Sequence, residues 1–292
     1  MMLVKGSIVA LITPFNENGS VNFNKLGELI EFHVKNKTDA LLVLGTTGET
    51  PTLSHEEDDS VVKYTIEKVD GRLPIYVGAG SNNTTTQLTY CKKYEKMGAD
   101  ALLVIAPYYN KANEEGMYLH FKTVADEVNI PLILYNVPGR TGCSISYSVV
   151  KRLATHKNIA AIKEASGDIS YLAKISKLAS EDFYVYSGND DMVVPAMSLG
   201  GSGVISVSAN ILPEAMHNMV TYYLEGKTDE ALHLQLKYLD LINALFIETN
   251  PIPVKEAMNQ LGMEVGGYRL PLTYMSDANR EILINELKVM ED

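Results

Sequence analysis

Eight short apolar runs alternate along the chain with longer amphipathic stretches. Successive runs are separated by roughly 20 to 35 residues, which is typical of repeated βα units that build a parallel sheet. Eight such units predict an α/β fold, a (β/α)8 or TIM barrel. The expected strands are residues 7–12, 40–44, 74–78, 101–106, 132–136, 159–163, 183–187 and 203–206.

Amphipathic stretches between the runs, several of them introduced by Ser, Thr or Asn, predict helices. Clear examples are residues 24–36, 55–69, 84–97 and 115–128. From Leu212 onward the strand pattern stops, and helices are expected over 213–224, 229–246 and 253–261. We therefore predict a catalytic barrel over residues 1–210 and a helical region over residues 211–292. No linker rich in Gly, Ser or Pro separates them, so the helical region should pack on the barrel.

Composition excludes several classes of protein. With 292 residues, 46% of them hydrophobic, the chain can bury a large core. A net charge of -11 without a clustered basic face disfavours binding to nucleic acid or to an anionic membrane. No run approaches the roughly 18 to 20 apolar residues of a membrane span, and residues 1–7 show no leader pattern. The expectation is a cytoplasmic protein.

The two cysteines, Cys91 and Cys143, suit a reducing compartment. They provide neither a disulfide framework nor a set of zinc ligands. We therefore expect both to be bystanders, and we expect no metal and no cofactor.

Lys163 ends the apolar run that begins at Ile159. At the end of a strand buried on both faces, an amine is partly desolvated, which disfavours its charged form and lowers its pKa. A neutral amine is a nucleophile that can attack a ketone or aldehyde and form a Schiff base. The alternative is a structural lysine paired with a neighbouring acid such as Glu164, and this residue alone does not decide between them.

Other expected strands also end in polar residues, and in a barrel the chemistry lies at these ends. The second is followed by Gly45-Thr-Thr-Gly-Glu, whose N–H groups and hydroxyls could bind a carboxylate, although such turns are common in loops. Tyr135, on the strand before Lys163, could shuttle a proton, or could be a core or interface tyrosine. Arg140 offers a planar fork that suits a carboxylate, or is a solvated surface charge.

Five segments together resemble the pyruvate-dependent class I aldolase group that includes N-acetylneuraminate lyase. Within it, the chain is most similar to the dihydrodipicolinate synthase family, because Arg140 stands where that family holds the carboxylate of aspartate semialdehyde. The resemblance spans essentially the whole chain, with the small departure that Ala106 stands where threonine is more usual. The segments are Leu11-Ile-Thr-Pro-Phe, Gly45-Thr-Thr-Gly-Glu, Pro107-Tyr-Tyr-Asn, Tyr135-Asn-Val-Pro-Gly-Arg-Thr and Ile162-Lys-Glu-Ala-Ser-Gly.

The resemblance implies a role for each matching residue. Lys163 would form an imine with pyruvate, and the resulting enamine would attack aspartate semialdehyde before cyclisation. Arg140 would orient that second substrate, and Thr47 would hold the pyruvate carboxylate. The remaining implied residues are Tyr135, Thr46 and Tyr109 in a proton relay, and Gly188 and Ile205 lining the pocket.

Assembly and regulation are also implied by the resemblance alone. In the family, the residue that matches Tyr109 reaches into a neighbouring subunit, which implies a homo-oligomer, a dimer usually paired into a tetramer. Many members bind lysine in a regulatory cleft. His55, Asn82 and Tyr108 match that cleft, whereas Pro51, Asp58 and Thr86 replace its usual alanine, histidine and glutamate. The missing glutamate predicts weak or absent inhibition by lysine, because an incoming ammonium group must be desolvated without an opposing charge. The alternative is that Asp58 replaces the missing negative charge, from a helix start and with a shorter side chain.

Two other functions remain open. Another pyruvate aldolase or lyase of the same group would keep Lys163 and Tyr135 but use a different aldehyde, and Arg140 argues against it. A non-catalytic barrel would be expected to have lost Lys163, Tyr135 or Thr46, and the chain has all three.

Overall fold

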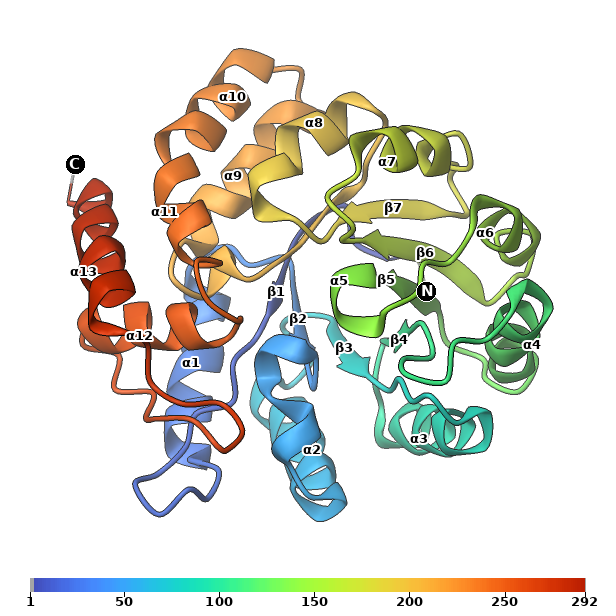
Figure 1. The fold of residues 1–292 in the computed structure, drawn as a ribbon, viewed down its shortest axis with the longest axis horizontal. Coiled ribbons are helices and arrows are strands. Elements are labelled where there is room, and N and C mark those ends of the chain that lie inside the picture. The colour runs from blue at the N-terminus through green and yellow to red at the C-terminus, as the bar shows by residue number, and fades with distance from the viewer. Residues whose placement is uncertain (1–2, 292) are drawn as a thin grey trace. The chain divides into compact units, whose positions relative to one another are not determined.

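A computed structural model of the chain describes residues 3–291. Residues 1, 2 and 292, which belong to the predicted segments 1–7 and 211–292, lie outside the described residues. Eight parallel strands follow one another in chain order around a closed barrel, which confirms the predicted α/β barrel (Figure 1). The strands are β1 Gly6–Ala10, β2 Ala40–Val43, β3 Ile75–Gly78, β4 Ala101–Ile105, β5 Leu132–Asn136, β6 Ile159–Glu164, β7 Tyr184–Ser187 and β8 Gly203–Ser206.

The chain divides into two compact units. The first unit comprises Pro74–Ile205 together with the described part of Met1–Gly6. It contains β3 to β7, most of β8, and six α-helices within its described residues. These helices are α3 Thr84–Met97, α4 Glu114–Ala125, α5 Pro138–Thr141, α6 Tyr147–Leu153, α7 Ile169–Ser176 and α8 Val193–Ser198, with a 3-10 turn η3 at Asp190–Met192.

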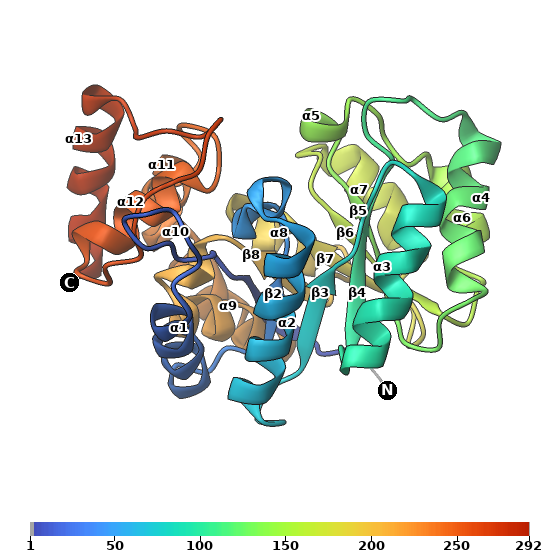
Figure 2. The same ribbon diagram turned by 90° about the horizontal axis from the view of Figure 1, so that it is seen from below.

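The strands of the first unit are almost continuously apolar and buried, as expected of parallel strands that are covered on both faces. Successive helices α3, α4, α6 and α7 pack side by side along this unit (Figures 1 and 2). The pairing of β5 with β6 is irregular between Leu132 and Ile133, after which Tyr135 pairs with Lys163 and Asn136 with Glu164. This register positions candidate site residues described below.

The second unit comprises Ser7–Leu73 and Ser206–Asp292, described here as far as residue 291. In it β1 pairs with β2, from Ile8 opposite Ala40 onward. Its α-helices are α1 Phe23–Lys35, α2 His55–Val69, α9 Pro213–Leu224, α10 Thr228–Lys237, α11 Leu239–Ala244, α12 Ile252–Gln260 and α13 Asp277–Glu286. Its 3-10 turns are η1 Thr46–Gly48, η2 Thr50–Thr52, η4 Ser208–Asn210 and η5 Leu287–Met290.

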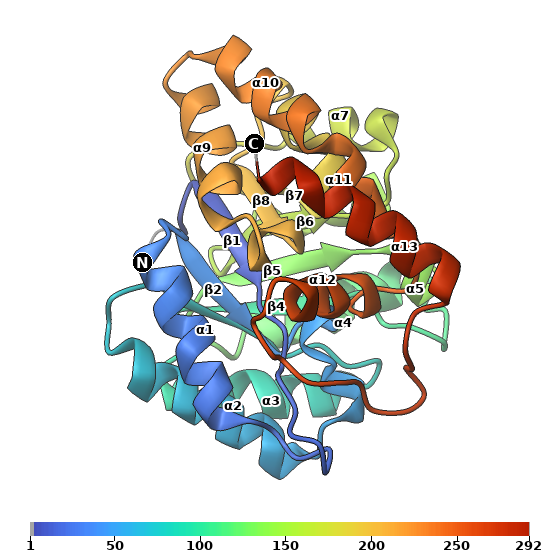
Figure 3. The same ribbon diagram turned by 90° about the vertical axis from the view of Figure 1, so that its left-hand side faces the viewer.

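Within this second unit, C-terminal residues pack against the N-terminal segment. Asn210 on η4 donates from Nδ2 to the carbonyl of Ala10 at 2.9 Å, and Lys255 on α12 contacts the segment after β1. Helices α11, α12 and α13 pack together at the C-terminal end (Figure 3). The division into domains 1–210 and 211–292 stays a prediction.

One helical expectation needs correction. The predicted helix 229–246 is two helices, because Tyr238 leaves helical geometry, with φ −98° and ψ 5°, between α10 and α11. The sequence has no Gly or Pro near Tyr238, and the apolar pattern of a helix continues through this position, so the sequence does not indicate the break. Helix α13 lies within the predicted helical region 211–292, but the sequence does not indicate its bounds, since Leu283 is its only fully covered apolar residue and the apolar stripe is too narrow to recognise.

Candidate active site

Lys163 lies near the carboxyl end of β6 and is only 6% exposed. In the strand register it stands directly opposite Tyr135 on β5 and Tyr186 on β7. Its Nζ lies 4.6 Å from the centre of the Tyr135 ring, which is within the range of a cation–π contact when the amine is charged. The register therefore places Tyr135 beside Lys163.

Glu164, the neighbour of Lys163, points to the opposite face of β6, as alternate residues of a strand do. Its carboxylate accepts hydrogen bonds from Asn136 Nδ2 at 2.6 Å and from the Ser166 N–H at 2.7 Å. Burial raises the pKa of Glu164, and these two donors partly offset that effect. Among the described residues no carboxylate lies within 4.0 Å of Lys163 Nζ, so the structure does not support the alternative of a structural Lys163–Glu164 ion pair.

Space around Lys163 depends on Gly188, which follows β7. A Cβ atom built on Gly188 would lie 2.8 Å from Lys163 Cε and 2.6 Å from Ala165 Cβ. Any larger residue would therefore displace the lysine side chain. Ile205 on β8 is fully buried in the same unit. The predicted lining residue Gly188 therefore lies beside the predicted nucleophile and leaves room for it.

Arg140 lies on the short helix α5, after β5, and is exposed. Tyr108 and Tyr109 follow β4, and Tyr109 is 89% exposed with a φ of 72°. A tyrosine in the left-handed region is uncommon, and such strain is often kept at functional positions. Asn82 donates from Nδ2 to the Tyr108 carbonyl at 3.2 Å, so the first unit brings these two predicted cleft residues together.

The turn after β2 carries the two predicted threonines, in the second unit. Thr46 is half-buried and Thr47 is buried, and both lie on η1. The turn closes by hydrogen bonds from the Gly48 N–H to the Gly45 carbonyl and from the Glu49 N–H to the Thr46 carbonyl. Asn250, more than two hundred residues later in the chain, donates from Nδ2 to Thr47 Oγ1 at 3.0 Å.

A buried ion pair beside this turn was missed by sequence reasoning. Lys255 on α12 donates from Nζ to Glu49 Oε1 at 2.7 Å, and neither side chain is accessible to solvent. Burial lowers the pKa of Lys255, and the Glu49 carboxylate partly offsets that effect. Lys255 also donates to the Thr13 carbonyl at 3.2 Å, while Thr13 Oγ1 donates to the Gly48 carbonyl at 2.7 Å.

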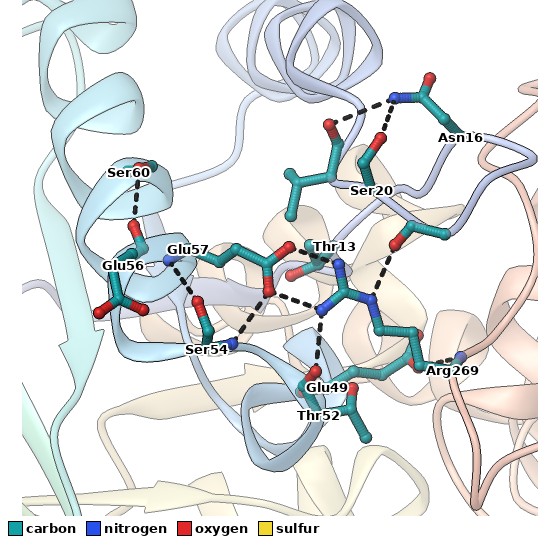
Figure 4. A network of polar contacts seen from close by, with 12 residues as sticks. Thr13, Asn16, Ser20, Glu49, Thr52, Ser54, Glu56, Glu57, Ser60 and Arg269 are labelled. Atoms are coloured by element: carbon teal, nitrogen blue, oxygen red, sulfur yellow. Dashed lines mark hydrogen bonds and ion pairs between the residues drawn. The ribbon is translucent and has the colours of Figure 1, made fainter.

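Arg269 closes a polar network around the same turn (Figure 4). Its guanidinium donates to both carboxylate oxygens of Glu57, at 2.7 and 2.5 Å, and to the Thr52 carbonyl at 2.8 Å. The hydrogen bonds from Arg269 hold the pKa of Glu57 below its ordinary value. No local sequence pattern predicts these contacts, because each contact joins a residue before position 60 to a residue after position 250.

The remaining cleft residues lie on helices. His55 begins α2 and is exposed, whereas Asp58 is buried, with Oδ2 3.8 Å from His55 Nδ1. Thr86 lies in the first turn of α3, where its N–H donates to the capping Asn83 side chain.

A cavity of about 670 Å³ in the first unit contains none of the predicted site residues. Its lining includes Pro131, Ala160 and Tyr184, which lie at the amino ends of β5, β6 and β7. Barrel enzymes carry their chemistry at the carboxyl ends of the strands, so this cavity is not the catalytic centre.

Candidate membrane-spanning helices and metal-ligand clusters are both absent from residues 3–291. No helix in this range is long and apolar enough to cross a membrane. No group of three or more His, Cys, Asp or Glu side chains in the same range could hold a metal ion.

A closed parallel barrel with a buried lysine beside a tyrosine, near the carboxyl ends of adjacent strands, defines the class of lysine-dependent barrel enzymes. The chain belongs to the dihydrodipicolinate synthetase family, whose model matches residues 3–290.

Named relatives agree with this assignment. The 4-hydroxy-tetrahydrodipicolinate synthase 1 of Clostridium acetobutylicum is 54% identical over 288 residues, which covers 99% of this chain and 98% of the relative. The crystal structure of dihydrodipicolinate synthase from Aquifex aeolicus is 46% identical with a TM-score of 0.95, covering 98% of each chain. The chloride-inhibited dihydrodipicolinate synthase from Acinetobacter baumannii, complexed with pyruvate, is 42% identical with a TM-score of 0.96, covering 99% of each chain.

Proposed function

We propose that the chain condenses pyruvate with L-aspartate 4-semialdehyde to give 4-hydroxy-tetrahydrodipicolinate, through a Schiff base on Lys163. The observation that carries the proposal is the buried lysine on β6, opposite Tyr135 and beside Gly188, where a larger residue would not fit. The pyruvate complex of the Acinetobacter baumannii relative supports the first substrate. The full-length match to named synthases supports the second. We also propose that the enzyme acts in the cytoplasm, in lysine and diaminopimelate biosynthesis.

The covalent step begins when the neutral Lys163 amine adds to the ketone of pyruvate. Loss of water gives an imine, and loss of a methyl proton gives an enamine. The enamine carbon then forms a bond with the aldehyde carbon of the semialdehyde, whose oxygen takes up a proton. The amino group of the joined chain finally displaces Lys163 from the imine carbon, which closes the ring and regenerates the free amine.

Each step moves a proton, and hydroxyl groups can carry protons where water is excluded. Tyr135 lies beside Lys163 in the strand register. We assign the relay to Tyr135 and Thr46, with Tyr109 as its third member. Thr47 is assigned to the pyruvate carboxylate because it matches the residue that holds this group in the family that the chain resembles.

Borohydride trapping tests this proposal. Pyruvate plus borohydride is expected to inactivate the enzyme permanently, because reduction converts the imine into a stable secondary amine. Peptide mapping should place the added mass on Lys163. Borohydride without pyruvate is the control, and an adduct on another residue would refute the assignment. Product formation from the two substrates then distinguishes this synthase from an aldolase that uses another aldehyde.

We infer that Tyr109 acts in the site of a second copy of the chain. The ring is 89% exposed on a strained backbone, so it makes little contact within its own subunit. Tyr109→Phe should lower kcat while leaving the oligomer intact, because only the hydroxyl is removed. Analytical ultracentrifugation and steady-state kinetics check both parts, with the exposed Tyr274→Phe as control. A stable wild-type monomer as active as the oligomer would contradict the inference.

We propose that lysine inhibits this enzyme weakly or not at all. Thr86 provides no carboxylate, and the Asp58 carboxylate is buried beside His55, where it is poorly placed to receive a ligand ammonium. A lysine titration of the steady-state rate should show little inhibition at submillimolar concentrations. Thr86→Glu places a carboxylate at the third position of α3, which tolerates it well, and should strengthen inhibition. Clear submillimolar inhibition of the wild type would overturn the proposal.

A further inference from the structure

The turn that carries Thr46 and Thr47 is fixed by residues of the C-terminal segment. Glu49 ends the turn in the left-handed region, with φ 55°, which a residue with a side chain rarely adopts. Its carboxylate is held by Lys255 at 2.7 Å and approached by the Arg269 N–H at 3.4 Å. Separating Glu49 from Lys255 would leave a buried charge without a partner, which is costly. The ion pair therefore holds Glu49, and with it the end of the turn, in one position.

Asn250 acts on the turn differently, because it touches Thr47 itself. A hydroxyl group has one donor hydrogen and two acceptor positions. Asn250 Nδ2 donates to Thr47 Oγ1 at 3.0 Å and so occupies one of the acceptor positions. The hydrogen of the Thr47 hydroxyl must then point away from Asn250 Nδ2. Both side chains are buried, so water competes poorly for this contact.

We propose that Asn250 is a positioning residue that makes the Thr47 hydroxyl a donor toward the carboxylate of pyruvate. A carboxylate only accepts hydrogen bonds, so a hydroxyl that faces it must donate. The amide of Asn250 enforces that direction before the substrate arrives, which avoids a reorientation on binding. The proposal rests on the proposed function, in which Thr47 holds the pyruvate carboxylate. It adds a residue from the C-terminal segment to the determinants of first-substrate binding.

Asn250→Asp tests the direction of this hydrogen bond with almost no change of shape. The new carboxylate accepts where the amide donated, so it turns the Thr47 hydrogen toward itself and adds negative charge near a carboxylate site. The KM for pyruvate is expected to rise by roughly 10-fold to 100-fold, which is the loss of one charge-assisted hydrogen bond. kcat at saturating pyruvate and the KM for the semialdehyde should stay within about threefold of wild type.

Matched variants separate this role from a structural one. Asn259→Asp makes the same substitution at an amide that binds the Gly266 carbonyl and does not touch the turn. It should leave the KM for pyruvate unchanged even if the melting temperature falls. Asn250→Ser, a neutral change, covers the possibility that the aspartate variant does not fold. It removes the amide donor and should raise the KM for pyruvate by roughly 3-fold to 10-fold.

Borohydride trapping gives a second readout, because its dependence on pyruvate concentration involves no second substrate. The half-saturating pyruvate concentration should shift in parallel with KM for both Asn250 variants. A shift of less than twofold in folded Asn250→Asp or Asn250→Ser would overturn the role of Asn250, as would a fall in kcat with KM unchanged. Trapping of the wild type reports the proposed function separately, so the two failures are distinguishable.

Discussion

Lys163→Ala is expected to reduce the rate of condensation by several orders of magnitude, on the order of 10³-fold or more. The substitution removes the atom that forms the covalent bond, and no other residue on β6 offers an amine. The loss should appear in kcat as well as in kcat/KM. Mass spectrometry after borohydride treatment should find no pyruvate adduct in the variant.

A matched variant shows whether Lys163→Ala loses activity because the nucleophile is missing or because a positive charge is missing. Lys163→Arg keeps a long cationic side chain, but a guanidinium group is not deprotonated in proteins and cannot form the imine. It should be as inactive as the alanine variant. The exposed Lys151→Ala on α6 should retain wild-type activity.

Thermal unfolding distinguishes a catalytic lysine from a structural one. Among the described residues, Lys163 has no carboxylate within 4.0 Å, because Glu164 binds Asn136 and Ser166 instead. Removing a buried amine without an ionic partner should leave the melting temperature of Lys163→Ala close to that of the wild type. A less stable variant that retained most of its activity would show that the lysine is structural, and would end the Schiff-base assignment.

The strands and the lysine were predictable because their signals are local. A buried parallel strand reads as a short apolar run, and Lys163 interrupts such a run at its end. The pairing of Tyr135 with Lys163 also follows, since consecutive strands of a barrel are neighbours and both residues stand near the same strand end.

The supports of the Thr46–Thr47 turn could not be predicted in the same way. Lys255 lies on α12, whose local pattern only indicates a helix, and Asn250 lies just before that helix. Their partners, Thr47 and Glu49, are about two hundred residues away. A contact between such distant segments depends on how the C-terminal segment packs against the N-terminal one. A single sequence does not indicate that packing. The break at Tyr238 was missed for another reason, because tertiary packing overrides a continuous helical pattern.

Arg140→Ala is expected to lower kcat/KM for aspartate semialdehyde by roughly 10-fold to 150-fold. The change removes a charge-assisted hydrogen bond to the substrate carboxylate, worth about 1.5 to 3 kcal/mol. The half-saturating pyruvate concentration for borohydride trapping should not change, because trapping precedes the second substrate. Steady-state kinetics with each substrate varied in turn provide the measurement.

The control variants define what Arg140 contributes beyond charge. Arg140→Lys keeps the charge but loses the planar fork, so it should recover only part of the activity toward the semialdehyde. Arg152→Ala removes an exposed arginine that pairs with Glu115 on the surface and should not alter either KM. An equal rise in the half-saturating concentrations of pyruvate and semialdehyde for Arg140→Ala would indicate a general disturbance of the site. That result would contradict a specific role of Arg140 in binding the carboxylate of the semialdehyde. The alternative that the enzyme uses another aldehyde, as other aldolases of the group do, would then be open again.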